Sequence, residues 1–180
     1  LLALGLPNTR YFMSGWLRKI VPLGVVTHII GTFHTPPQTE PERRVRCFRN
    51  AASVLRRTGE SVYLSPEGRR VTDGAIGRFN KGAFHLATEL QAPIVPFYID
   101  IPPEINPGLS YSKVAPGTVH VYVLPEISTE GWELDDLVEN KESVRDVLVR
   151  FEEELRAGRR QPAEPQETNT PRASFARTGK

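Results

Sequence analysis

Residues 61–101 form the stretch that most constrains the fold of this chain. Residues 62–64 are a short apolar run of strand formers, which Pro66 ends because proline cannot donate a hydrogen bond to a β-ladder. After a polar turn, apolar residues recur at helical spacing from about residue 79 to residue 91 on a single stripe. Residues 94–99 are apolar almost throughout, as is typical of a strand buried on both faces. The stretch is therefore predicted to fold as strand, turn, helix and strand.

The turn between the first strand and the helix carries the candidate binding site, formed by Glu67, Gly68, Arg69 and Arg70. Ligands of open α/β sheets bind just outside the carboxyl ends of the strands. Two guanidiniums suit a phosphate, because each planar fork can donate two hydrogen bonds to its oxygens. Glu67 could orient a guanidinium or accept a hydrogen bond from a ligand hydroxyl. On composition alone such a turn is more often a solvated loop, so both interpretations stay open at this point.

Three pieces of this stretch resemble the glycerolipid acyltransferase family, which includes the enzymes that acylate lysophosphatidate (1-acylglycerol-3-phosphate). The pieces are residues 65–70 (SPEGRR), residues 77–84 (GRFNKGAF) and residues 92–96 (APIVP). Their order and spacing carry the resemblance, which extends over about residues 1–155. It implies an α/β fold in which a mixed central sheet is flanked by helices. It also implies an O-acyltransferase of phospholipid biosynthesis, which moves a fatty acyl group from an acyl thioester to the hydroxyl of a lysophospholipid.

The resemblance assigns substrate binding to the turn. Glu67, Gly68 and Arg70 match the third motif of the family, whereas Arg69 stands where the family usually has threonine. Residues 31–37 stand where the family has its second motif, but no arginine is in register there. His34 could replace that donor, although a lone histidine in a loop is more often solvated or structural. A second hypothesis is that the additional charge of Arg69 compensates for the missing arginine.

The family supplies its base as a histidine followed five positions later by an aspartate, and no histidine of this chain has that partner. Five positions beyond His28, His34, His85 and His120 stand Phe33, Thr39, Leu90 and Pro125. We therefore assign no catalytic residue. In the family the pair lies just upstream of a helix like residues 1–6, so the sequence is interpreted as truncated at its N-terminus. These residues alone are expected to transfer no acyl groups.

Other segments are predicted from local pattern. A short strand is expected at residues 10–13, and an arginine-rich helix is expected from about residue 39 to residue 59. The arginines of that helix could attract an anionic lipid or an acyl donor, but a solvated helix face is the favoured interpretation. The apolar residues 16–20 and 24–30 are either core helices or a hydrophobic surface.

Two further elements complete the prediction. In residues 118–124 valine alternates with polar or larger residues, which predicts a strand whose valine face is buried. A last helix with an apolar stripe is expected over about residues 133–157. Residues 1–157 are predicted to form one domain, and residues 158–180, which are poor in apolar side chains, a disordered tail.

Composition limits the partners. The 23 Lys and Arg residues nearly balance the 21 Asp and Glu residues, which gives no support to a nucleic-acid binder. A single cysteine excludes an internal disulfide and multi-cysteine metal sites, so no metal is predicted. The expected partners are a lysophospholipid acceptor, an acyl thioester donor carried by coenzyme A or by a carrier protein, and the cytoplasmic face of a membrane. No further cofactor is implied. The alternative is a non-catalytic lipid- or phosphate-binding module.

Overall fold

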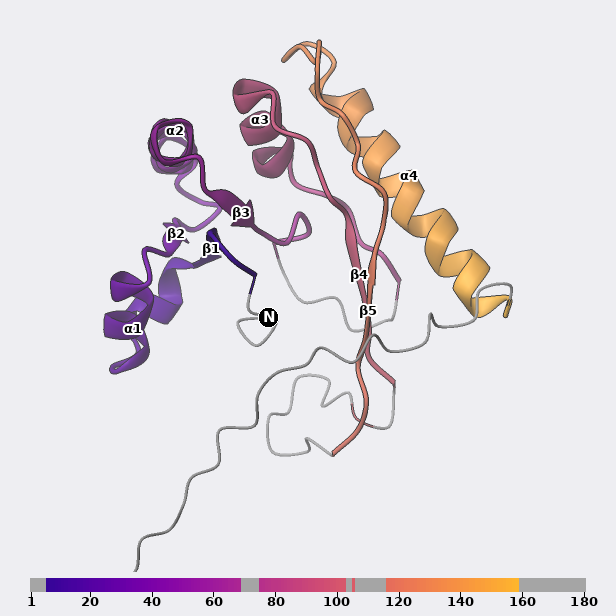
Figure 1. Ribbon diagram of the computed structural model, residues 1–180. Coiled ribbons are helices and arrows are strands. Elements are labelled where there is room, and N and C mark those ends of the chain that lie inside the picture. The colour runs from indigo at the N-terminus through magenta and orange to yellow at the C-terminus, as the bar shows by residue number, and fades with distance from the viewer. Residues whose placement is uncertain (1–5, 69–74, 103–104, 106–115, 159–180) are drawn as a thin grey trace, which may run out of the picture.

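The computed structural model describes residues 6–68, 75–102, 105 and 116–158 (Figure 1). Apart from Leu6 and Gly158, the predicted N-terminal helix end and the predicted tail lie outside these residues. Arg69 and Arg70 of the candidate site lie outside them as well.

The strands pair into one parallel and one antiparallel sheet. In the parallel sheet β1 (Thr9–Ser14) lies between β2 (Phe33–Thr35) and β3 (Ser61–Tyr63). In the antiparallel sheet β4 (Phe97–Asp100) pairs with β5 (His120–Val123). The predicted α/β class with both kinds of strand pairing is confirmed. Within the described residues the two ladders form separate sheets rather than one mixed sheet.

The two sheets adjoin where β3 meets β4. The rings of Tyr63 and Phe97 lie 6.2 Å apart between their centroids, and the ring of Tyr11 lies 6.0 Å from that of Tyr63. These aromatic contacts add packing energy beyond the area that the rings bury. The side of the parallel sheet that carries β3 is therefore tied to the start of β4.

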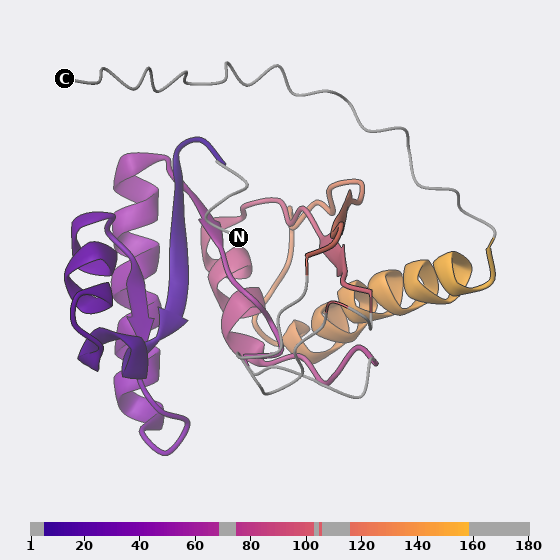
Figure 2. The ribbon, with the colours of Figure 1, turned by 90° about the horizontal axis from the view of Figure 1, so that it is seen from below.

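The helices cover these sheets (Figures 1 and 2). They are the short 3-10 helix η2 (Gly15–Lys19), α1 (Leu23–Ile29), α2 (Pro41–Thr58), α3 (Lys81–Leu90) and α4 (Leu137–Arg156). In both views α3 lies between α2 on one side and α4 on the other. The expected helices around residues 39–59, 79–91 and 133–157 are thus present, with ends shifted by a few residues.

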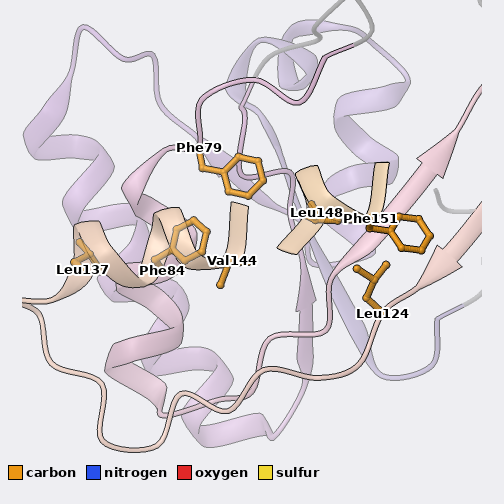
Figure 3. Close-up of a cluster of buried hydrophobic side chains, with 7 residues drawn as sticks. All are labelled: Phe79, Phe84, Leu124, Leu137, Val144, Leu148 and Phe151. Atoms are coloured by element: carbon orange, nitrogen blue, oxygen red, sulfur yellow. The ribbon is translucent and has the colours of Figure 1, made fainter. Parts of the chain in front are cut away.

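Helix α3 buries two faces. Leu86 packs into a cluster with Ala52 and Leu55 of α2, beside the parallel sheet. Phe84 packs into a second cluster with side chains of α4, such as Val144 (Figure 3). The sequence predicted one apolar stripe and missed Phe84, which is only 2% exposed. A helix packed on both sides needs apolar residues outside a single stripe.

Two predictions of strand burial are wrong. The strand expected at residues 94–99 begins at Phe97, Val95 is exposed, and none of the β4 residues is fully buried. Pro96 cannot donate to a ladder, so only Ile94 bridges to Ile127 ahead of the strand.

The face assignment of β5 is also wrong. Val121 and Val123 are exposed, whereas Tyr122 is half-buried with its ring 5.2 Å from that of Phe151 on α4. The larger aromatic side chain faces the helix, because a ring buries more apolar area there than a valine does. The alternation of side chains in the sequence predicted that a strand forms here. It did not show which face of that strand packs against the protein.

Candidate functional site

The candidate site begins where the chain leaves β3 and turns. The turn closes through the Gly68 amide, which donates to the Ser65 carbonyl at 3.2 Å. Gly68 has a φ of +65°, and a Cβ placed there would lie 2.7 Å from Nδ2 of Asn80. Glycine is therefore required at this position for two reasons, the left-handed backbone and the close approach of Asn80.

Hydrogen bonds tie the turn to the residues just before α3. The Asn80 side chain donates from Nδ2 to the Glu67 carbonyl at 2.7 Å, and the Asn80 amide donates to the Pro66 carbonyl at 2.7 Å. The Gly77 amide donates to Oε1 of Glu67 at 2.6 Å. A carboxylate that accepts a backbone N–H forms a charge-assisted bond, which is stronger than a neutral one. Glu67 thus closes the base of the loop that runs from the turn to α3.

Arg145 of α4 supports the same loop from the other side. Its guanidinium donates from Nε to the Gly77 carbonyl and from Nη2 to the Ile76 carbonyl, both at 2.9 Å. Two donors of one rigid fork fix two successive carbonyls, which a lysine could not do in the same way. Gly77 is therefore held at its amide by Glu67 and at its carbonyl by Arg145.

The four predicted binding residues divide into two pairs. Glu67 and Gly68 lie together at the turn, and the structure gives the Glu67 carboxylate a backbone partner in addition to any ligand. Arg69 and Arg70 are outside the described residues, so their role stays a prediction.

Sequence reasoning missed two residues that shape the site. Asn80 belongs to the piece GRFNKGAF, in which the resemblance assigns it no role of its own. Arg145 lies 68 residues from Gly77 along the chain, and no spacing rule could have joined them.

The turn sits at the edge of the parallel sheet where the strands end. Because β1, β2 and β3 are parallel, their carboxyl ends point to the same edge. Helix α3 begins next to the turn, and the partial positive charge of a helix N-terminus favours anionic groups there. Arg78 and Lys81 at this end are exposed. The helix N-terminus and these two cations lie beside the Glu67 carboxylate at the described part of the turn.

His34, the candidate replacement for the missing second-motif arginine, is used within the protein. It lies in β2, and its Nε2 is 3.1 Å from Oγ1 of the buried Thr27. The Thr27 hydroxyl donates its one proton to the Gly24 carbonyl, so it accepts from His34. Burial lowers the pKa of His34, and the charges of Arg18 and His28 lower this pKa further. A histidine kept neutral in this way is a poor substitute for a phosphate-binding cation.

The arginines of α2 are partly engaged with the protein. Arg44 donates to the Pro36 carbonyl at 2.8 Å, just beyond β2, and so holds the segment that stands where the family has its second motif. Arg43 forms an ion pair with Glu40, and Arg56 forms one with Glu89. Surface ion pairs of this kind contribute little to stability. These contacts agree with the favoured interpretation of a solvated helix face.

A family model described as "Acyltransferase" matches residues 4–100, which include the parallel sheet, the turn and α3. The chain belongs to the acyltransferase family. The resemblance predicted from the pieces around the turn is thereby confirmed.

Curated acyltransferases resemble the chain over longer or shorter stretches. The 1-acyl-sn-glycerol-3-phosphate acyltransferase of Limnanthes douglasii is 28% identical over 160 residues, covering 80% of this chain and 55% of the relative. The 1-acyl-sn-glycerol-3-phosphate acyltransferase alpha of Mus musculus is 35% identical over 94 residues, covering 52% of this chain and 33% of the relative. The acyltransferase chain thus spans between a third and just over half of these two relatives.

A solved structure supports the fold. The 1-acyl-sn-glycerophosphate (LPA) acyltransferase PlsC from Thermotoga maritima superposes with a TM-score of 0.64 at 22% identity, covering 83% of this acyltransferase chain and 58% of that one. At this identity the likeness shows a shared architecture. Among the helices that the structure describes, none combines the length and apolar character needed to cross a bilayer.

The first prediction concerns the base of the loop. Replacing Glu67 with Ala should speed hydrogen exchange of the Gly77 amide about tenfold or more, because a hydrogen bond to a charged group contributes ~1.5–3 kcal/mol. Exchange measured by NMR would report the change at that amide. Glu126→Ala removes an exposed glutamate elsewhere and is the matched control. Equal protection of Gly77 in both variants would show that the carboxylate does not order the loop.

The second prediction is a pH dependence. Because folding lowers the His34 pKa, the unfolded state binds more protons between this lowered value and the ordinary value of about 6.5. Stability should therefore rise with pH across this window and be lost as the pH falls through the folded pKa. Urea unfolding at about pH 7.5 and about pH 5.5 measures it.

The matched variants are His34→Gln and His120→Gln. The first should flatten the dependence, and the second should retain it. A wild-type protein that is equally stable at both pH values would contradict the prediction.

Proposed function

We propose that this chain forms the acceptor-binding part of an O-acyltransferase that moves a fatty acyl group from an acyl thioester to the hydroxyl of a lysophospholipid such as lysophosphatidate. The observation that carries this proposal is the Glu67–Gly68 turn at the carboxyl edge of the parallel sheet, closed onto the start of α3. The relatives that match over this region are named as 1-acyl-sn-glycerol-3-phosphate acyltransferases, which supports a phosphate-bearing acceptor.

Arg69 and Arg70 follow directly after this turn in the sequence and are the proposed cations for the acceptor phosphate. In the family, one arginine of the second motif and one of the third motif would neutralise the phosphate together. In this chain two adjacent guanidiniums of the turn could do the same. The lowered pKa of His34 supports the idea that Arg69 takes over from the missing arginine, since a lowered pKa favours the uncharged imidazole. The binding function therefore rests on a turn rather than on two separate motifs.

The donor is proposed to be an acyl thioester of coenzyme A or of a carrier protein, and no further cofactor is needed. Acyl transfer requires a base at the acceptor hydroxyl and donors for the developing oxyanion. A lipid acceptor also places the protein at a membrane surface, and we propose the cytoplasmic face. No nucleic-acid partner is proposed.

A non-catalytic lipid- or phosphate-binding module is the second candidate. The observation that favours it is the lack of an aspartate five positions after any of the four histidines. The two candidates share the acceptor site and differ only in whether a base is delivered to it.

The third prediction tests the acceptor site on this chain. Short-chain lysophosphatidate, kept below its micelle concentration, should bind, and Arg70→Ala should weaken binding about tenfold or more because a charge-assisted pair is lost. Arg69→Thr should also weaken lysophosphatidate binding, but by a smaller factor than Arg70→Ala. Titration calorimetry gives the affinities. Arg57→Ala, at an exposed position of α2, is the control. Wild-type affinity in the two turn variants would remove the proposed site.

The fourth prediction separates binding from catalysis. These residues carry no histidine–aspartate pair, so incubation with an acyl thioester and lysophosphatidate should give no acceptor-dependent release of free thiol. A colorimetric thiol assay follows the reaction. Robust acceptor-dependent turnover would show that this chain carries a base of its own. A chain extended upstream with the family's pair should turn over substrate if the first candidate is correct, and should bind without turnover if the second is.

A further inference from the structure

Helices η2 and α1, with the residues between and just after them, expose several large apolar side chains to solvent. Val21, between the two helices, is 81% exposed, Ile29 is 76% exposed and Trp16 is 63% exposed. Thr27 is the one buried residue of the two helices. The exposed apolar set, named the η2–α1 surface, comprises Trp16, Ile20, Val21, Val25, Val26, Ile29 and Ile30. Large apolar side chains exposed together on two adjoining helices point to an interaction site rather than to ordinary surface scatter.

The orientation of this surface is fixed by the packing beneath it. A Cβ placed on Gly24 would lie 2.3 Å from the Arg18 carbonyl oxygen, so η2 and α1 touch at backbone distance. Thr27 faces inward, where its hydroxyl bonds Gly24 and His34. Residues one helical turn apart share a face, and Val25 and Ile29 therefore point outward together. The helices cannot bury these side chains by rotating without losing the Thr27 contacts.

The charged side chains of the two helices are cations only, Arg18 and Lys19. The sequence contains no Asp or Glu before Glu40, whereas Arg18 and Lys19 are exposed at the end of η2. A second copy of the chain meeting this surface about a two-fold axis would bring like charges together. An anionic bilayer fits better, because its interface accepts apolar side chains and tryptophan while its headgroups attract lysine and arginine.

The η2–α1 surface begins next to the edge of the parallel sheet at which the candidate site lies. Ser14 ends β1 and caps η2, since its side chain accepts from the Trp16 amide at 3.4 Å. A Cβ on Gly15 would lie 2.9 Å from the carbonyl oxygen of Thr35, which ends β2. The start of η2 therefore lies at the same edge of the sheet as the turn that follows β3. A lipid leaving the bilayer beside η2 would arrive at the proposed acceptor site.

We propose that the η2–α1 surface is the face by which this chain lies in the interface of an anionic membrane. Trp16, Val21 and Ile29 enter the boundary between headgroups and acyl chains, and Arg18 and Lys19 contact the anionic headgroups. The inference deepens the proposed function, on which it rests for the lipid nature of the acceptor. It places the membrane contact within these residues and on a surface that the acceptor site does not use.

The fifth prediction is tested by sedimentation with vesicles of phosphatidylcholine, with and without phosphatidylglycerol. The chain should bind the anionic vesicles more tightly. The double variant Val21→Ser/Ile29→Ser should lose about tenfold or more in partitioning, because two aliphatic side chains then no longer leave water for the interface. Arg18→Gln/Lys19→Gln should lose about thirtyfold on anionic vesicles only, since two cations at ~1 kcal/mol each together correspond to that factor.

The matched control is Val119→Ser/Val123→Ser, which removes two exposed valines at β5 and should bind as the wild type does. Urea unfolding should show all three variants within ~0.5 kcal/mol of wild type, because the changed side chains are exposed. Trp16 should also shift its fluorescence to the blue on anionic vesicles, and Trp16→Phe should lose that shift.

Three outcomes would overturn the inference. They are the absence of vesicle binding by the wild type, equal binding by Val21→Ser/Ile29→Ser, and a wild-type dimer in analytical ultracentrifugation that the same double variant dissociates. The short-chain lysophosphatidate titration uses no vesicles, so it fails or succeeds separately. If the chain failed to bind the acceptor but still bound vesicles, the proposed function would be wrong and the membrane-binding surface would be retained.

Discussion

Helix α3 is packed on both sides, and the rest of the structure depends on that packing. Leu86 faces the cluster shared with α2, and Phe84 faces the cluster shared with α4. Rotation of the helix would expose apolar side chains on one side or the other, so its orientation is fixed. The start of α3 is thereby held at a defined place between β3 and α4. At this place the turn that follows β3 and Arg145 of α4 both contact the loop before α3.

The loop base shows how a binding motif can be built largely from backbone contacts. Glu67 is the acidic residue of the motif, yet its Oε1 accepts from the Gly77 amide. Asn80 completes the closure by reaching back to the Glu67 carbonyl across the space that Gly68 leaves open. A turn ordered in this way loses less conformational entropy when a ligand binds, which is the general advantage of a preorganised site. The glutamate thus acts first on the shape of the turn.

The segment around β2 departs from the family and has a structural role instead. Burial lowers the pKa of His34, and its Nε2 bonds the Thr27 hydroxyl, which joins β2 to α1. The same contacts leave the apolar residues of α1 facing outward. The position that would have held a phosphate-binding arginine therefore now supports the η2–α1 surface.

The sequence by itself determined the elements that depend on local signals. Helix α2 begins at Pro41 and ends at Thr58, just before Gly59, as its start and stop residues indicate, and β3 and α3 follow from short-range spacing. Tertiary structure alone decided which face of β5 packs, that Phe84 is core, that α1 is a surface and that Arg145 reaches Gly77. Those outcomes depend on surfaces supplied by residues far away in the chain, and periodicity records only the repeat of a pattern, not what it will pack against.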